Sequence, residues 1–147
     1  MITTRTIYRP ARQGDYKALH RLAEAGGQGG AVAYQFPTIV VERDGQLVGF
    51  AATQRWSKRL MVGPVVVAET VRLKGLVAIR AVLEIEKVLK EEGALYYLIG
   101  TANPGLMRIC EAFGCEKVPS EDGDAWFLRR LRPAPRGAFL GSPRRAS

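Results

Sequence analysis

The sequence of 147 residues has a single histidine, His20, and only two cysteines, Cys110 and Cys115. The usual zinc sites use four closely spaced cysteine or histidine ligands, which these residues cannot supply. No apolar stretch approaches the roughly 20 residues that cross a bilayer, and no N-terminal apolar run has the length of a signal peptide. We therefore expect a protein without a bound metal or a membrane span, located in the cytoplasm or in a particle assembled inside a cell.

Acidic residues are absent from residues 129–147, which contain six arginines. The net charge is +8, but without this segment 16 basic residues face 14 acidic ones. Proline, glycine and serine interrupt residues 132–147 and leave no apolar face that could pack. We predict a domain over residues 1–131 and a basic tail over residues 132–147. The predicted contacts with a protein or nucleic-acid partner are Arg129, Arg130, Arg132, Arg136, Arg144 and Arg145.

The first third of the chain contains signals for a strand, a helix and a hairpin. Residues 2–9 alternate weakly between apolar and polar side chains, which predicts a strand. Asp15 can cap a helix that follows it. Asp44-Gly45 readily adopts the positive φ angles of a two-residue turn, so residues 38–42 and 47–53 are predicted to form an antiparallel hairpin.

The most informative stretch is residues 61–115, in which two apolar runs flank an amphipathic segment. Val65, Val66 and Val67 form one apolar run, typical of a strand buried on both faces, and residues 95–99 form the other. Between them apolar side chains recur every three or four residues, and Gly93 ends the pattern as a left-handed helix cap would. This pattern predicts a βαβ unit with parallel strands. The predicted packing face of its helix consists of Ala78, Val82, Ile85 and Leu89.

The turn before this helix reads Arg72-Leu73-Lys74-Gly75. Backbone N–H groups at a helix N-terminus, next to cations, suit a pyrophosphate. A solvated arginine and a glycine that permits a tight turn explain Arg72 and Gly75 equally well. On the residues alone, both interpretations stay open.

With the segment at residues 101–115, this turn resembles the GNAT superfamily of acyl-CoA-dependent N-acyltransferases. The central turn of that family reads Arg/Gln-x-x-Gly-x-Gly/Ala, and its last helix reads Asn, seven residues, Tyr, then a short run to Gly-Phe. Arg72 and Gly75 match the turn, and Asn103, Glu111 and Gly114 match the second motif.

Two positions depart from the family pattern. Val77 stands where the family has Gly or Ala, so a branched side chain lies where the backbone should approach a pyrophosphate. Cys110 stands where many members carry a tyrosine that protonates the departing CoA thiolate. Without that tyrosine, the proton would come from water, Tyr96 or Tyr97, or the product thiolate would leave unprotonated.

The resemblance implies an α/β fold of the GNAT kind: a mixed central sheet flanked by helices on both faces, in the order β-α-β-β-β-α-β-α-β-β. It also implies acetyl-CoA as cofactor, bound where two parallel strands splay apart. The pantetheine arm would pair with one strand and the pyrophosphate would bind the turn. The implied cofactor-binding residues are Val65, Val66, Val67, Arg72, Lys74, Gly75, Val77 and Asn103.

The catalytic residues are unknown from the sequence, and three candidates are weak. Glu42 and Glu69 are carboxylates that could act as general bases, although exposed glutamates usually serve solvation. Cys110 shares an apolar stripe with its helix neighbours, so a buried structural thiol is the plainer interpretation. Asn103 precedes a proline and is also the expected N-cap of any helix.

The leading hypothesis is an acyl-CoA-dependent N-acyltransferase that transfers an acetyl group to an amine of an unidentified acceptor. The alternative is a catalytically inactive GNAT-fold protein with a structural or docking role, for example in a virus particle or another assembly, whose tail binds a partner. Val77 and Cys110 motivate this alternative. Neither hypothesis involves a membrane, and both are compatible with an oligomer.

Overall fold

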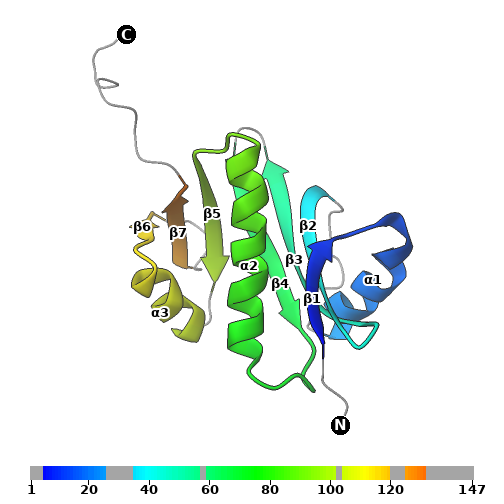
Figure 1. Ribbon diagram of the computed structural model, residues 1–147. Coiled ribbons are helices and arrows are strands. Elements are labelled where there is room, and N and C mark those ends of the chain that lie inside the picture. Colours follow the sequence, from blue (N-terminus) through cyan, green and yellow to red (C-terminus); the bar gives the residue numbers. More distant parts are fainter. Residues whose placement is uncertain (1–4, 26–34, 57–58, 102–103, 120–124, 132–147) are drawn as a thin grey trace, which may run out of the picture.

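The computed structural model describes residues 5–25, 35–56, 59–101, 104–119 and 125–131. Its strands form one sheet in the order β1-β2-β3-β4-β5-β7-β6 (Figure 1). The predicted order of elements and the mixed sheet are both confirmed. Along the chain the elements are β1 (Thr6–Pro10), the short 3₁₀ helix η1 (Gln13–Asp15), α1 (Tyr16–Ala25), β2 (Gln35–Arg43), β3 (Gln46–Trp56), β4 (Arg59–Val67), α2 (Lys74–Glu91), β5 (Tyr96–Thr101), α3 (Pro104–Ala112), β6 (Glu116–Val118) and β7 (Ala125–Arg130).

The first four strands pair with one another in antiparallel fashion. The predicted hairpin is confirmed, because Asp44 and Gly45 connect β2 to β3 with φ angles of 52° and 83°. Only β4 and β5 are parallel among the described strand pairs, as expected for two strands joined by the crossover helix α2. The strand pairing therefore changes from antiparallel to parallel at β4 and β5.

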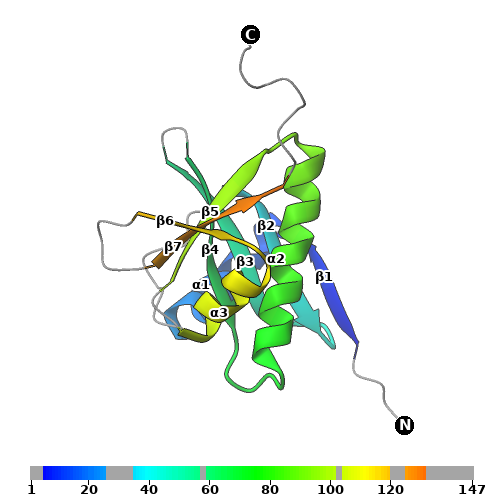
Figure 2. The same cartoon turned by 90° about the vertical axis from the view of Figure 1, so that its left-hand side faces the viewer.

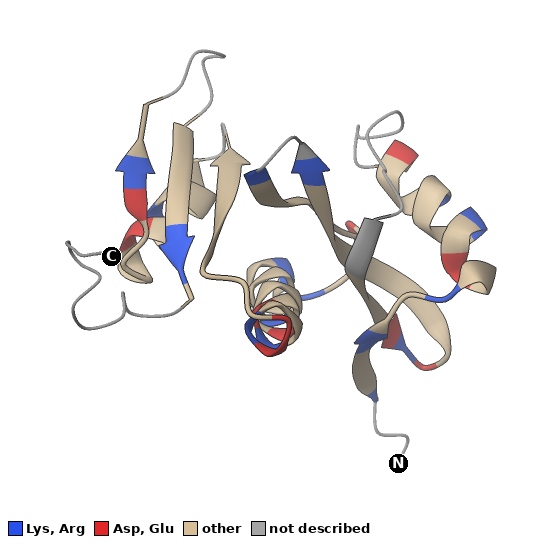
Figure 3. Cartoon of the chain, turned by 90° about the horizontal axis from the view of Figure 1, so that it is seen from above, with Lys and Arg blue, Asp and Glu red and all other residues tan. Residues whose placement is uncertain are grey.

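Helices cover both faces of the sheet, as predicted. Seen from above, α2 lies against one face and α1 against the other (Figure 3). Two separate apolar clusters correspond to these two layers. The larger one joins α2 to the sheet and includes Cys110 of α3, and the smaller one is built around Leu19 of α1 and Phe50 of β3. In the view turned by 90°, α2 is again seen along nearly its full length (Figure 2).

The packing face of α2 differs from the prediction at two positions. Val77 and Ala81 are buried together with Ile85 and Leu89, whereas Ala78 and Val82 are only half-buried. Residues four apart lie on one face of a helix, so the buried set forms a single stripe. The sequence is apolar at four consecutive positions, residues 76–79, and the pattern alone could not fix this rotation.

Both ends of α2 follow local backbone rules. Leu73 precedes the helix with a φ of +57°, and Gly93 follows it with a φ of +89°, which confirms the predicted left-handed cap. The solvent side carries an ion-paired set in which Glu84 binds Arg80 and Lys87. No helix in the described part of the chain is both long and apolar enough to cross a bilayer.

The close approach of β5 and β7 generates a stability prediction. A Cβ atom added at Gly100 would lie 2.7 Å from the Trp126 ring, whereas one added at Gly14 would meet nothing within 4 Å. Because the ring must move, Gly100→Ala is expected to lower the free energy of unfolding by about 2 kcal/mol. Gly14→Ala is the matched control and should change it by less than about 1 kcal/mol. Urea denaturation measures both, and equal effects would contradict the packing described.

Candidate functional site

The parallel strands β4 and β5 separate along most of their length. Within the described residues they share one ladder pair, Met61 with Leu98. β4 continues to Val67 and β5 to Thr101 without a further pair. The two strands therefore enclose an opening that widens toward their C-terminal ends.

A bulge on β4 lies next to this last pair. Gly63 and Pro64 stand opposite a single residue of β3, because the β3–β4 register shifts between Ala51 and Thr53. The peptide bond between Gly63 and Pro64 is cis. A bulge bends the strand that contains it, and proline has no N–H to offer a neighbouring strand. Pairing between β4 and β5 thus ends where β4 bends.

The open edge of β4 directs backbone groups into the gap. The N–H of Ala68 donates to the carbonyl of Val48 on β3 at 2.8 Å. Successive residues of a strand turn their N–H groups to opposite sides. The amides of Val67 and Val65 therefore point away from β3, toward β5.

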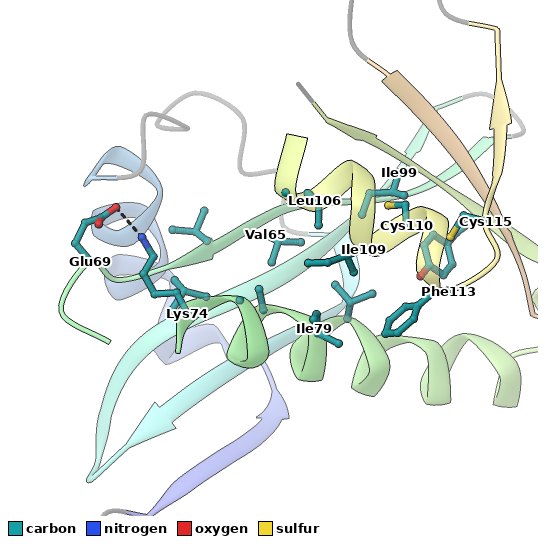
Figure 4. A pocket seen from close by; sticks show the side chains of 17 residues that line it. Val65, Glu69, Lys74, Ile79, Ile99, Leu106, Ile109, Cys110, Phe113 and Cys115 are labelled. Atoms are coloured by element: carbon teal, nitrogen blue, oxygen red, sulfur yellow. Dashed lines mark ion pairs between the residues drawn. The ribbon is translucent and has the colours of Figure 1, made fainter. Parts of the chain in front are cut away.

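A cavity of about 540 Å³ occupies this region between β4, β5, α2 and α3. Figure 4 shows its two ends: Glu69 and Lys74 lie at one, and Phe113 and Cys115 at the other. Apolar side chains such as Val65 form most of the wall between them. The cavity therefore offers charge at its mouth and an apolar interior, a combination typical of small-molecule sites.

The mouth lies at the N-terminus of α2. The N-cap residue, Leu73, has no side-chain acceptor for the first helical amides, and no acidic residue lies in the first turn. The helix dipole and these amides favour an anion. Lys74 adds a positive charge, although its ammonium group binds the Glu69 carboxylate at 2.8 Å. Glu69 is 90% exposed, so this ion pair is weak and an incoming anion can displace it.

The cavity brings together most of the residues singled out in the sequence. Its wall contains five of the predicted cofactor-binding residues and two of the candidate catalytic residues. These are Val65, Val66, Val67, Lys74 and Gly75, with Glu69 and Cys110.

Three other predicted residues lie elsewhere, and a fourth, Asn103, is outside the described residues. Arg72 is exposed on the turn and does not line the cavity. Val77 is 6% exposed and packs in the core beneath α2, one residue before the cavity-facing Ala78. Its isopropyl group therefore does not obstruct the cavity. Glu42 on β2 accepts a hydrogen bond from Arg9 at 3.0 Å and is not part of the wall.

The predicted partner contacts at Arg129 and Arg130 are engaged within the domain. Both residues belong to β7, where Arg129 binds Glu86 and Arg130 binds Glu116. The side chain of Arg129 is 26% exposed, so little of it is open to a partner. The remaining predicted contacts, Arg132, Arg136, Arg144 and Arg145, lie outside the described residues.

A buried polar network supports the end of the cavity at which Phe113 and Cys115 lie. Glu86 of α2 is 3% exposed. Tyr97 donates its hydroxyl to Glu86 Oε2 at 2.7 Å, and Arg129 donates to the same oxygen at 2.9 Å. Arg129 also donates to the carbonyl of Phe113 at 2.8 Å, which joins α2, β5, β7 and the end of α3. Sequence reasoning did not identify this network, although a glutamate next to Ile85 within an apolar stripe is a signal for it.

Among the potential proton donors that line the cavity, Tyr97 and Cys110 hold their protons tightly. Burial, reinforced by the Glu86 carboxylate, raises the pKa of Tyr97 far above its ordinary value. Burial, followed by the neighbouring Cys115, raises the pKa of Cys110 to about 11. Both groups are therefore neutral at physiological pH and are weak acids.

Arg129 and Arg130 provide a matched test of the buried network. In Arg129→Met the Glu86 carboxylate remains buried without its cationic partner, so the free energy of unfolding should fall by about 3 kcal/mol. Arg130→Met removes an ion pair whose side chains are 62% and 53% exposed, and should cost less than about 1 kcal/mol. Chemical denaturation compares them, and similar losses in the two variants would contradict the network.

The raised pKa of Cys110 predicts how this thiol reacts. In a Cys115→Ser variant Cys110 is the only thiol, and its alkylation by iodoacetamide requires the thiolate. Since burial is the main cause of the shift, the rate should rise with a midpoint above pH 10 in the folded protein. In denaturant the midpoint should fall to about 8.5. A folded-state midpoint near 8.5 would show that the thiol is not buried as described.

Comparison with solved structures places this architecture among known folds. N-acetylglutamate synthase from Neisseria gonorrhoeae, in complex with coenzyme A and N-acetyl-glutamate, matches 88% of the chain with a TM-score of 0.69 and 16% identity. The chain spans only 36% of that protein. The PaiA N-acetyltransferase from Thermoplasma acidophilum, in complex with coenzyme A, matches 86% of the chain and 99% of its own length, with a TM-score of 0.68 and 13% identity.

A third match is the ribosomal-protein-S18-alanine N-acetyltransferase from Escherichia coli. It covers 92% of the chain and 100% of its own length, with a TM-score of 0.70 and 12% identity. No family model and no curated protein sequence matches the chain. At these identities the likeness lies in the fold, and it confirms the fold that the sequence motifs predicted. The chain therefore has the GNAT fold of the N-acetyltransferases.

Proposed function

We propose that this chain is an acyl-CoA-dependent N-acyltransferase, with acetyl as the acyl group and an amine of unidentified identity as acceptor. The observation that carries the proposal is the cavity at the β4–β5 opening, with the N-terminus of α2 at its mouth. The structural neighbours support it, since several are N-acetyltransferases in complex with coenzyme A.

The mouth of the cavity fits the pyrophosphate of coenzyme A. The amides of Lys74 and Gly75 belong to the first turn of α2, where no intrahelical acceptor is available to them. The Lys74 ammonium adds a charge-assisted contact once it leaves Glu69. A diphosphate carries more negative charge than the Glu69 carboxylate, so the exchange is favourable.

The body of the cavity fits the pantetheine arm. That arm contains two amide groups on a short aliphatic chain, and it needs hydrogen bonds along one side and apolar contact elsewhere. The amides of Val65 and Val67 face the opening and supply the polar edge. Ala78, Val82 and Ile109 supply apolar contacts from the two helices.

Coenzyme A would supply the acyl group as a thioester, whose carbonyl carbon an amine can attack. The protein holds and orients the reactants, which can provide much of the rate. Backbone N–H groups on the open edge of β4 are placed to stabilise negative charge that develops on a carbonyl oxygen. The apolar wall excludes water and strengthens such contacts.

The described side chains of the wall contribute little acid or base chemistry. Cys110 and Tyr97 keep their protons because their pKa values are raised. Glu69, the carboxylate among the wall residues, lies at the mouth and pairs with Lys74. Positioning and backbone electrostatics are therefore the main sources of rate in this proposal, and an amine that arrives unprotonated is the reactive acceptor.

Calorimetric titration with coenzyme A tests the site at its mouth. Lys74→Ala should weaken binding about tenfold, the effect of losing one charge-assisted hydrogen bond. Glu69→Gln should strengthen it several-fold, because the competing carboxylate charge is gone. Lys87→Ala is the control, since Lys87 lies on the solvent side of α2 and binds Glu84. Absence of binding at millimolar coenzyme A, or equal affinity in Lys74→Ala, would reject the site.

Transfer itself is tested with acetyl-CoA and a mixture of amino acids, polyamines and peptides with free N-termini. Mass spectrometry of the products should show one class acetylated faster than without protein. If coenzyme A binds but no class of amine is acetylated, the transfer step is contradicted and the chain is only a cofactor-binding protein.

A further inference from the structure

The end of the cavity opposite Lys74 and Glu69 contains both cysteines of the chain. Cys110 of α3 is buried, with 4% of its surface exposed, and Cys115 in the turn after α3 is half-buried. Both line the cavity (Figure 4), and neither is oxidised. Two thiols on one cavity wall form a potential site of covalent modification.

The C-terminus of α3 holds these thiols together. Gly114 has a φ of +76°, and its N–H donates to the carbonyl of Glu111 at 3.0 Å. The N–H of Cys115 donates to the carbonyl of Cys110, also at 3.0 Å. These two hydrogen bonds define a Schellman motif, which folds the chain back so that Cys115 contacts the last full turn of the helix. The backbones of the two cysteines are therefore joined directly, and both residues line the same cavity.

The surroundings of the two sulfur atoms differ. Burial raises the pKa of the Cys115 thiol, and the nearby Arg129 guanidinium acts against that rise because it favours the Cys115 thiolate. Cys110 has no such cation among the groups that act on it, and both burial and Cys115 keep it protonated. Cys115 is therefore the thiol that ionises first, and the thiolate is the form that attacks disulfides.

We propose that Cys110 and Cys115 are a redox-active dithiol, which small disulfide compounds entering the cavity convert to a Cys110–Cys115 disulfide. The thiolate of Cys115 attacks one sulfur of the compound, which forms a mixed disulfide and releases one thiolate. Cys110 then loses its proton to that thiolate and attacks the Cys115 sulfur, which releases the second half of the compound. The dithiol loses two electrons and two protons, and the disulfide compound becomes two thiols.

Cys115, the thiol that attacks the oxidant, lines the cavity together with Cys110, so an oxidant inside the cavity can reach it. A ligand that fills the cavity should therefore protect the dithiol. This part rests on the proposed function, since coenzyme A is the ligand chosen for the test. Formation of the disulfide itself does not depend on that choice.

Glutathione disulfide is the probe for the first test, applied to the folded full-length protein. The wild-type protein should lose both thiols and retain no glutathione. Digestion should yield a peptide cross-linked between Cys110 and Cys115, and dithiothreitol should restore the two free thiols. Cys110→Ser should retain one glutathione, at a rate at least tenfold higher than Cys115→Ser. Two free thiols in the wild type after equilibration, glutathione on both cysteines, or equal rates in the two variants would overturn the proposal.

Coenzyme A, in its thiol-blocked S-methyl form, provides the second test. Saturating amounts should slow disulfide formation at least tenfold in the wild type. If the disulfide forms at an unchanged rate, the dithiol proposal stands and the cofactor site fails. If S-methyl coenzyme A binds by calorimetry but no disulfide forms without it, the cofactor site stands and the dithiol proposal fails.

Discussion

The structure depends on the interrupted hydrogen-bonded pairing between strands β4 and β5. β4 and β5 are neighbours in the sheet, yet they pair only at Met61 and Leu98, and the bulge at Gly63 and Pro64 bends β4 away beyond that point. Protein interiors pack at crystal-like density, so an unfilled gap between neighbouring strands is unusual. The gap leaves the edge of β4 without a partner strand and admits a cavity between α2 and α3. The proposed cofactor site depends on that unpaired edge.

Local rules in the sequence predicted most of the fold but not the depth of the cavity. Asp44-Gly45 and Gly93 act through backbone φ angles, so the hairpin and the end of α2 could be predicted from a few residues. The valine run at residues 65–67 has the sequence pattern of a strand buried on both faces, whereas its members line the cavity. A strand whose apolar side chains pack against protein and a strand whose apolar side chains line an apolar cavity have the same sequence pattern. Only the three-dimensional bend of β4 distinguishes them.

The departures from the family motif have different structural consequences. Val77 belongs to the buried stripe of α2, because the helix begins at Lys74 after a left-handed Leu73, and this rotation turns Ala78 toward the cavity. The valine is thus compatible with an open site. Cys110 does line the cavity, but burial makes its thiol a poor acid. The sequence pattern alone could not show which of these two residues faces the cavity.

A crystal structure of the protein with coenzyme A tests the central claim most directly. The account predicts the diphosphate at the amides of Lys74 and Gly75, and the pantetheine arm hydrogen-bonded to the backbone of Val65 and Val67, with β4 and β5 still apart. A continuous β4–β5 ladder in the crystal, or coenzyme A bound outside the opening between these strands, would contradict it.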